Sequence, residues 1–297
     1  MSDVTVVNVF TFNGAGGNPC PVVMDADGMS AAEMRDVARR YGHESGFVLP
    51  ADGEDHDFRF RFFVPNHEME MCGHATVGAL SLLARNGRLS GSTARISTLS
   101  GLVTGFVGEA SGALPSVEIT QPTGRLAVLA SDETDLVLKA LGISPGALAD
   151  RPLRNAATSR VKTLVPIRNA EQLNALATDM ATVEAACTHI GSTGLYPYAV
   201  VDEGSYLFEA RQFPRSSGYA EDAATGIAAT ALAFGLLADE LVADDRPMRI
   251  FQGRAMGRLS EIRVRIDFAG LKAIGCRVGG AVSLSPEEFH PHPEFAA

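Results

Sequence analysis

The chain has 297 residues, of which 46% are hydrophobic and 20% charged, and this length and composition predict two globular domains with their own cores. Its net charge of −10 argues against nucleic acid and anionic membrane surfaces as partners. The four cysteines lie far apart without a CxxC pair, and the chain has neither a basic leader nor an apolar run of about 18 residues. These features predict a cytoplasmic protein with reduced thiols.

Strand and helix patterns alternate along the first part of the chain. A capping box formed by Ser30 and Glu33 starts a helix that Gly42 ends, and a second helix follows Cys72 and ends at Asn86-Gly87. Periodicity of apolar and β-branched residues predicts strands at 4–12, 20–24, after 46, 58–64, 96–107 and 114–120.

Turn residues at Gln121-Pro122-Thr123-Gly124 predict a boundary, because a new helical signal follows them. We therefore predict an N-terminal half at 1–121, to which 282–297 returns, and a C-terminal half at 122–281. The second half is predicted to contain helices at 132–141, 170–178 and 182–190 and after Asp222, with strands at 161–167, 198–201, 207–213, 248–252, 261–266 and 273–278.

One short pattern occurs twice, 150 positions apart, as a strand, a loop of equal length and an apolar helix. The matched pairs are Phe58/Phe208, Arg61/Arg211, Phe63/Phe213, Val77/Ile227, Ala79/Ala229 and Leu82/Leu232. We interpret this repeat as a duplicated α/β unit. Its two helix starts, Cys72-Gly73-His74 and Asp222-Ala223-Ala224, are expected to face each other across a cleft and to handle a proton from opposite sides.

The residues at these helix starts are candidates for chemistry. First-turn amides attract anions, so two such ends could hold a small carboxylate. Asp222 could equally be only an N-cap, and Glu44 only a solvated surface charge. His74 is expected to be neutral, because the positive end of a helix disfavours imidazolium. It could bind a substrate heteroatom or simply a neighbouring backbone carbonyl.

Several other patterns are weaker. Cys72 and His74 with nearby His67 match no zinc spacing and lack a fourth ligand, so we predict no metal. Glu68 and Glu70 are expected to shape the loop or to face solvent. The glycines at 14–17 lack the later glycine of a dinucleotide fingerprint and the lysine of a P-loop, and no G-x-S-x-G elbow occurs.

Taken together, the motifs resemble the phenazine-biosynthesis PhzF-like family. They are Val9-Phe10-Thr11, Gly17-Asn18-Pro19, Glu44-Ser45, Phe63-Val64-Pro65 with Glu68, Cys72-Gly73-His74-Ala75-Thr76 and Glu221-Asp222-Ala223-Ala224-Thr225-Gly226. The resemblance implies a diaminopimelate-epimerase-like α+β fold, in which two similar halves each wrap a mixed sheet around a central helix and the site lies between them. It also implies a homodimer that needs no cofactor.

The resemblance assigns roles residue by residue. Glu44 matches the family's general acid/base, while His74 and Asp222 match its substrate-binding and proton-positioning residues. Substrate contacts are implied for Ser45, Gly73, Ala75, Ala223, Thr225 and Gly226, with the two glycines supplying backbone donors. Two positions depart from the family pattern: His43 precedes the acid/base, and Ile227 stands where a serine is usual.

The implied activity is a cofactor-independent isomerisation of a small cyclic or amino/hydroxy acid, similar to that of trans-2,3-dihydro-3-hydroxyanthranilate isomerase. An amino-acid epimerase that uses Cys72 is a first alternative. Related epimerases use two cysteines, but the residue 150 positions after Cys72 is Asp222, so a two-thiol mechanism is not expected. A second alternative is a small-molecule-binding protein without catalysis.

Overall fold

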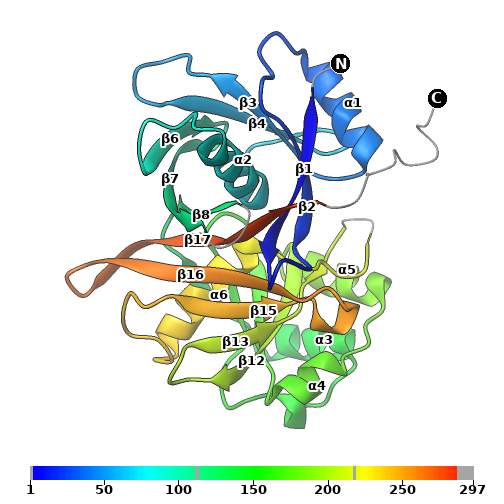
Figure 1. Cartoon of the computed structure of the whole chain (residues 1–297). Coiled ribbons are helices and arrows are strands. Elements are labelled where there is room, and N and C mark those ends of the chain that lie inside the picture. The colour runs from blue at the N-terminus through cyan, green and yellow to red at the C-terminus, as the bar shows by residue number, and fades with distance from the viewer. Residues whose placement is uncertain (1–2, 111–113, 217–218, 286–297) are drawn as a thin grey trace. The chain divides into compact units, whose positions relative to one another are not determined.

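A computed structural model describes residues 3–110, 114–216 and 219–285 (Figure 1). The chain divides into two compact units, Met1–Thr120 with Gly279–Ala297, and Gln121–Val278. Part of the segment predicted to return to the first half, residues 286–297, lies outside the described residues. In the described part of the chain, no helix is both long and apolar enough to cross a membrane.

The first unit is a mixed sheet with two helices. In chain order it contains β1 (Val4–Thr11), β2 (Asn18–Val23), α1 (Ala31–Tyr41), β3 (Ser45–Pro50), β4 (Phe58–Phe63), β5 (Glu68–Met69), α2 (Gly73–Arg85), β6 (Thr93–Thr98), β7 (Gly101–Ala110) and β8 (Pro115–Gln121). The pairs β1–β2, β3–β4 and β6–β7 are antiparallel, whereas β2–β3 and β4–β6 are parallel. The last residues of β17 (Lys272–Leu284) pair with β1.

The second unit contains more helices around a similar sheet. Its elements are β9 (Arg125–Val128), α3 (Ser131–Leu141), β10 (Arg154–Ala157), β11 (Lys162–Pro166), α4 (Ala170–Asn174), α5 (Met180–His189), β12 (Gly194–Asp202), β13 (Leu207–Ala210), β14 (Phe213–Pro214), α6 (Gly226–Ala238), β15 (Met248–Gln252) and β16 (Ser260–Ala269), with 3₁₀ turns at Pro145–Ala147 and Arg254–Met256. The pairs β10–β11, β12–β13 and β15–β16 are antiparallel, and β11–β12 and β13–β15 are parallel.

The two units follow the same plan. In each unit, the second strand of an antiparallel pair is followed by one or two helices and then by a strand parallel to it. The next strand is antiparallel to that one, and the central helix leads from it to another strand that lies parallel to it. The central helices are α2, which contacts β1, β2, β3 and β7, and α6, which contacts β9, β10, β11 and β16. Residues 74–83 of α2 and 228–236 of α6 are all buried. The predicted α+β fold of two similar halves around central helices is therefore confirmed.

The predicted repeat register holds for the strands but is wrong for the helices. Arg61 and Arg211 lie over the rings of Phe63 and Phe213, as the 150-residue spacing predicts. The helices α2 and α6, however, begin at Gly73 and Gly226, which are 226 − 73 = 153 positions apart. The second loop is therefore three residues longer than the first, and the predicted loops of equal length are incorrect.

Most predicted elements lie within a few residues of the observed ones. The helix predicted from the capping box is α1, with both capping hydrogen bonds present and Gly42 in the left-handed conformation. The strand predicted at 96–107 is divided between β6 and β7 by a turn at 99–100. The helix predicted at 170–178 ends at Asn174, and the short strands β5, β9 and β10 were not predicted.

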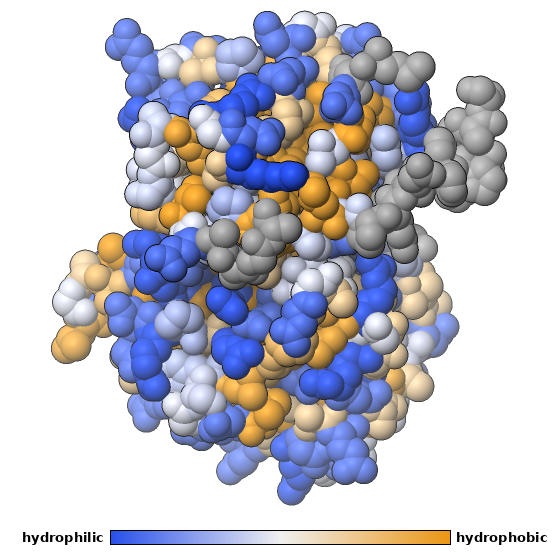
Figure 2. Space-filling model, in the orientation of Figure 1, coloured by the Kyte–Doolittle hydropathy of each residue, from blue (hydrophilic) through white to orange (hydrophobic). Residues whose placement is uncertain are grey.

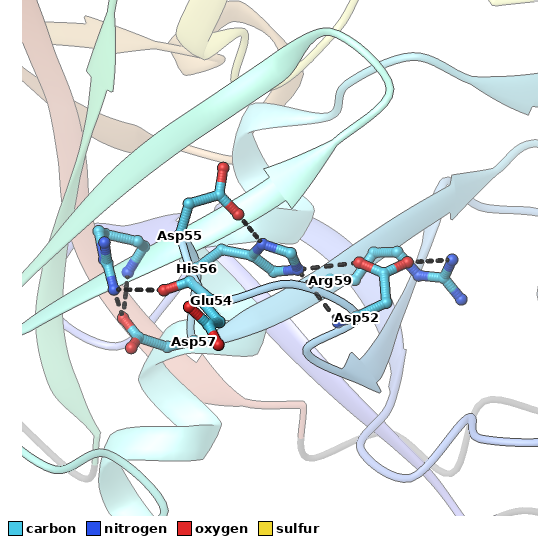
Figure 3. Close-up of polar contacts among 7 residues, drawn as sticks. Asp52, Glu54, Asp55, His56, Asp57 and Arg59 are labelled. Atoms are coloured by element: carbon cyan, nitrogen blue, oxygen red, sulfur yellow. Dashed lines mark hydrogen bonds and ion pairs between the residues drawn. The ribbon is translucent and has the colours of Figure 1, made fainter.

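The loop between β3 and β4 is held by polar contacts around His56, whose side chain is buried (Figure 3). Its Nδ1 lies 2.7 Å from Asp55 Oδ1, and its Nε2 lies 3.0 Å from Asp52 Oδ1. Arg59 also binds Asp52, through Nη1 and Oδ2 at 2.8 Å. The two aspartates therefore contact opposite nitrogens of one imidazole ring.

The hairpin between β16 and β17 exposes hydrophobic side chains at its end. Leu271 is fully exposed and Ile274 is 55% exposed. The hydrophobic surface at this protruding end is visible in Figure 2. Single exposed apolar residues are ordinary, whereas adjoining ones can form part of a contact surface.

Close approach of β17 to β8 depends on a glycine and gives a testable prediction. A Cβ at Gly279 would overlap the Val117 carbonyl oxygen and lie 2.9 Å from Glu118 Cα, and backbone atoms cannot rotate away. We expect Gly279→Ala to lower the free energy of unfolding by roughly 1–3 kcal/mol in urea titrations.

Gly91 is the matched control, because a Cβ there would meet nothing within 4 Å. Gly91→Ala should change the free energy of unfolding by no more than about 0.5 kcal/mol. Equal stability of the two variants would contradict the tight approach.

Candidate active site

The residues around the start of α2 are positioned by the neighbouring strand β3. Gly42 reverses the chain after α1, so that Glu44 directly precedes β3. A Cβ added at Gly46 would lie only 3.4 Å from Ala75 Cβ, so β3 runs close against the first turn of α2. Cys72 is the N-cap of α2, and its carbonyl accepts a 2.8 Å hydrogen bond from Thr76 Oγ1. Glu44 is thereby brought beside the helix start.

Glu44, Cys72 and His74 form one compact cluster. The thiol of Cys72 donates to Glu44 Oε2 at 3.5 Å, and His74 Nδ1 lies 3.4 Å from the same oxygen. The Cys72 Sγ and His74 Nδ1 atoms are also 3.4 Å apart. The Glu44 side chain is 35% exposed, whereas the His74 side chain is 9% exposed and Cys72 is buried. Glu44 is therefore not a freely solvated surface charge, and His74 has no hydrogen bond to a backbone carbonyl of the described residues.

The two ring nitrogens of His74 have different surroundings. In the tautomer with its proton on Nδ1, the imidazole directs that proton toward Glu44 Oε2, 3.4 Å away. Nε2 is then an acceptor, and it is buried without a hydrogen-bond partner among the described residues. Buried acceptors are rarely left without a partner in native proteins. Nε2 is thus a buried ring nitrogen whose hydrogen-bonding capacity the described residues leave unused.

Electrostatics keep the Cys72 thiol protonated. Burial raises the pKa of Cys72 well above its ordinary value, and the negative charge of Glu44 raises it further. The pKa of the buried Cys20 thiol is raised by the same two causes. A thiol in this environment is a hydrogen-bond donor rather than a base or nucleophile.

A second polar group lies before α6. Asp222 Oδ2 accepts a 2.5 Å hydrogen bond from Thr225 Oγ1, and its Oδ1 lies 3.5 Å from the Ala224 amide. Gln252 Nε2 donates to the Asp222 carbonyl at 2.7 Å and to Thr225 Oγ1 at 3.2 Å. Tyr196 in turn donates to Gln252 Oε1 at 3.0 Å. The N-cap of α6 is Thr225, so the interpretation of Asp222 as an N-cap is wrong.

Neither Gln252 nor Tyr196 was recognised from the sequence. Gln252 is fully buried at the end of β15, a strand that the sequence predicted without a role for this residue. Its position beside Asp222 depends on strand pairing between distant segments, which leaves no local pattern. Burial raises the pKa of Tyr196, and the negative charge of Asp222 raises it further, so this hydroxyl remains a donor.

An arginine fixes the loop before α2. Arg61 makes two hydrogen bonds of 2.7 Å to the two carboxylate oxygens of Glu68 while its guanidinium stacks over the Phe63 ring. Paired hydrogen bonds of this kind are directional as well as strong. The predicted loop-shaping role of Glu68 is confirmed, and Glu70 is exposed, the other expected outcome.

The corresponding arginine fixes the longer loop before α6. Arg211 binds both carboxylate oxygens of Glu221 at 2.9 and 2.7 Å and also donates to the carbonyls of Leu173 and Leu176. Its ring contact with Phe213 repeats that of the first unit. The glutamate partner occupies a different loop position in each unit, which hid the shared pairing in the sequence.

The remaining predicted residues lie next to these groups. Ser45 is buried, and its hydroxyl donates to the His43 carbonyl at 3.1 Å. Ala75 and Ala223 are buried in the helix start and in the loop, respectively. The side chains of both N-caps, Cys72 and Thr225, make no capping hydrogen bond. A meeting of Asp222 with the Glu44 cluster stays a prediction.

Within the described residues, one group has side chains placed to hold a metal ion. It consists of Glu44, Cys72 and His74, whose candidate ligand atoms lie within 4.8 Å of one another. His67, which the sequence placed near Cys72 and His74, does not belong to this group. The third side chain comes from Glu44, 28 residues before Cys72.

The two units thus share one α/β plan, with carboxylate, imidazole and hydroxyl groups beside the starts of α2 and α6. A family model described as phenazine biosynthesis-like protein matches residues 7–283. The chain belongs to this PhzF-like family, as predicted, and to its isomerase class of enzymes.

Individual relatives agree over nearly the whole chain. A Deinococcus radiodurans protein named an uncharacterized isomerase is 33% identical over 300 residues, covering 98% of this chain and 95% of its own. The trans-2,3-dihydro-3-hydroxyanthranilate isomerase of Pseudomonas fluorescens is 29% identical over 265 residues, 88% of each chain. The crystal structure of the Bacillus anthracis phenazine biosynthesis protein, PhzF family, matches with a TM-score of 0.84 at 22% identity over 95% of this chain and 96% of its own.

The state of the thiols gives a second prediction. Burial raises the pKa of Cys187 to about 11 and that of Cys276 to about 12, and it raises the pKa values of Cys20 and Cys72 as well. Thiolate forms only as the pH approaches these values, so the native protein should not react with a chromogenic disulfide at about pH 8.5, where an ordinary thiol is half ionised.

Unfolding in guanidinium should release all four thiols in the same assay. One rapidly reacting thiol in the native protein that disappears in Cys72→Ser would contradict the protonated state of Cys72.

Proposed function

We propose that the protein is a cofactor-independent isomerase that moves a proton within a small carboxylate-bearing molecule, with Glu44 as the general acid/base. The observation that carries this proposal is the contact of one carboxylate oxygen with both Cys72 and His74. The similarity to trans-2,3-dihydro-3-hydroxyanthranilate isomerase supports a small cyclic amino or hydroxy acid as the substrate.

Glu44 is suited to take up a proton and return it. Its contacts with described residues both use Oε2, which leaves Oε1 to face a substrate C–H. The Cys72 thiol and the His74 imidazole hold Oε2 in place as donors, so the base is oriented before the substrate arrives. Glu44 removes a proton from an activated carbon and returns it at a conjugated position as the double bonds shift.

The helix starts supply donors for a substrate carboxylate. The amides of Gly73 and His74 at the start of α2 have no partner among the described residues, and neither do those of Gly226 and Ile227 at the start of α6. Such first-turn amides favour anions through their N–H groups and the helix dipole. In this proposal His74 Nε2 accepts a hydrogen bond from a substrate hydroxyl or amino group. Asp222 is the proposed proton-positioning residue of the second unit.

The arrangement favours isomerisation by Glu44 over epimerisation by Cys72. A thiol base must ionise, whereas burial and the Glu44 carboxylate raise the pKa of Cys72. The N-cap that corresponds to Cys72 in the second unit is Thr225, at the 153-residue helix spacing. The sequence analysis had paired Cys72 with Asp222. Neither Asp222 nor Thr225 carries a thiol, so a two-thiol mechanism is not expected with either pairing.

Deuterium exchange from solvent tests the role of Glu44. Trans-2,3-dihydro-3-hydroxyanthranilate and a panel of cyclic amino and hydroxy acids are incubated in D₂O and analysed by mass spectrometry and NMR. We expect Glu44→Gln to slow deuterium incorporation and turnover by about 10²–10⁴-fold, because it removes the base and keeps the shape of the side chain. Cys72→Ala should retain turnover within about tenfold of the wild type, a loss of about 1.4 kcal/mol.

Glu70→Gln is the matched control, since Glu70 is an exposed glutamate in the loop before the same helix. It should exchange at the wild-type rate. Full turnover of Glu44→Gln on a substrate of the wild-type enzyme would disprove the assignment. The absence of exchange across the whole panel would favour a non-catalytic binding protein.

The homodimer implied by family resemblance is part of the proposal, with the exposed end of the β16–β17 hairpin as its contact. We expect Leu271→Asp to shift sedimentation equilibrium toward monomer, because a buried aspartate without a partner is unfavourable. Leu99→Asp is the control, since Leu99 is exposed in a different turn. A monomeric wild type would contradict the dimer, and an unchanged Leu271→Asp would contradict this contact.

A further inference from the structure

We propose that Glu44, Cys72 and His74 form an inhibitory binding site for Zn²⁺ with three protein ligands and one water. The ligand atoms are Glu44 Oε2, Cys72 Sγ and His74 Nδ1. The binding site stands on geometry alone, whereas its inhibitory effect rests on the proposed role of Glu44 as the acid/base.

The distances within the cluster match one face of a zinc tetrahedron. They are 3.5 Å for Sγ to Oε2, 3.4 Å for Sγ to Nδ1 and 3.4 Å for Nδ1 to Oε2. Zinc bonds of about 2.3 Å to sulfur and about 2.0–2.1 Å to nitrogen and oxygen, at tetrahedral angles, require separations of about 3.5 Å to sulfur and about 3.3 Å between nitrogen and oxygen. The three atoms therefore need to move by only a few tenths of an ångström at most to bind one ion.

The chemistry of the donors also suits zinc. Thiolate and imidazole are preferred by zinc over calcium and magnesium, which favour oxygen ligands. As the Zn–S bond forms, the Cys72 S–H bond breaks and its proton passes to solvent, while the ion gives up water molecules. The imidazole binds the ion through the lone pair of Nδ1 and carries its own proton on Nε2. No electron is transferred. The thiolate and the Glu44 carboxylate together balance the two positive charges of the ion.

The cluster is open on the side of Glu44. The Glu44 side chain is 35% exposed, so a hydrated ion can reach Oε2 before the buried thiol and imidazole. Three protein ligands leave a fourth position for water, as in open zinc sites. Once coordinated, the Glu44 carboxylate cannot take up a substrate proton, which makes the bound ion inhibitory.

The polar group around His56 provides a contrast within the same unit. Asp55 and Asp52 contact Nδ1 and Nε2, two ring nitrogens that are separated by Cε1 and point in different directions (Figure 3). An ion bound to one nitrogen cannot be reached by both carboxylates in this arrangement. Both groups contain a histidine beside acidic residues, but only in the Glu44 cluster do the ligand atoms converge on one point.

Cobalt and zinc titrations of the full chain test the site. Co²⁺ should add a thiolate-to-cobalt charge-transfer absorption at one equivalent, and Zn²⁺ should displace it. Competition with a chromogenic chelator gives the zinc affinity, which we expect to fall at least tenfold in Cys72→Ser, Glu44→Gln and His74→Gln, with loss of the cobalt band in Cys72→Ser. If Cys72→Ser or His74→Gln fails to fold, the zinc affinity of Glu44→Gln still tests the site.

Cys187→Ser is the matched control, because Cys187 is also a buried free thiol and is not part of the cluster. It should bind zinc as the wild type does. Wild-type affinity in both Cys72→Ser and Glu44→Gln, or the absence of a cobalt–thiolate band in the wild type, would overturn the site.

Inhibition is measured separately, as loss of deuterium exchange at saturating Zn²⁺ and its recovery after chelation. Undiminished exchange with zinc bound would overturn the inhibitory role. If the wild type catalyses no exchange, the proposed isomerase function fails, while the metal titrations still decide the binding site.

Discussion

The burial of the two central helices, over residues 74–83 and 228–236, is the constraint on which the candidate site depends. Because α2 and α6 are enclosed by strands along most of their length, their exposed polarity is concentrated at their ends. The first amides of a helix have no partner within it. Cys72 and Thr225 do not supply one from their side chains. Each unit therefore presents backbone donors at the point where the loop residues meet the helix.

The loops that reach these helix starts require their own support. In each unit, an arginine at the end of a strand binds a glutamate through two hydrogen bonds and stacks on the phenylalanine two residues later. Arg211 and Glu221 are the more buried pair, with side chains 8% and 11% exposed, against 24% for each member of the Arg61–Glu68 pair. Loss of one partner would leave a buried charge behind, so these pairs serve to specify loop conformation.

The sequence predicted local features well because their causes are local. Ser30, Glu33 and Gly42 define α1 through hydrogen bonds and backbone conformation within a few residues. The alignment of α2 with α6 was predicted incorrectly because their apolar residues also match at a spacing of 150. The correct spacing is 153, since the second loop is three residues longer. Gln252 was missed because β15 pairs with β13 and β16, which brings it to Asp222 from 30 positions away.

Correct helix alignment changes the chemical comparison of the two units. At the 153-residue spacing, Cys72 corresponds to Thr225 and His74 to Ile227. Of these two side chains at the start of α2, only Cys72 therefore has a polar counterpart at the start of α6. Asp222 lies three residues before that N-cap, and its carboxylate accepts from Thr225. Glu44 retains an oxygen that no described residue binds. The two helix starts are therefore chemically unequal, and the proposed mechanism, in which one carboxylate removes and returns the proton, requires only the groups of the first.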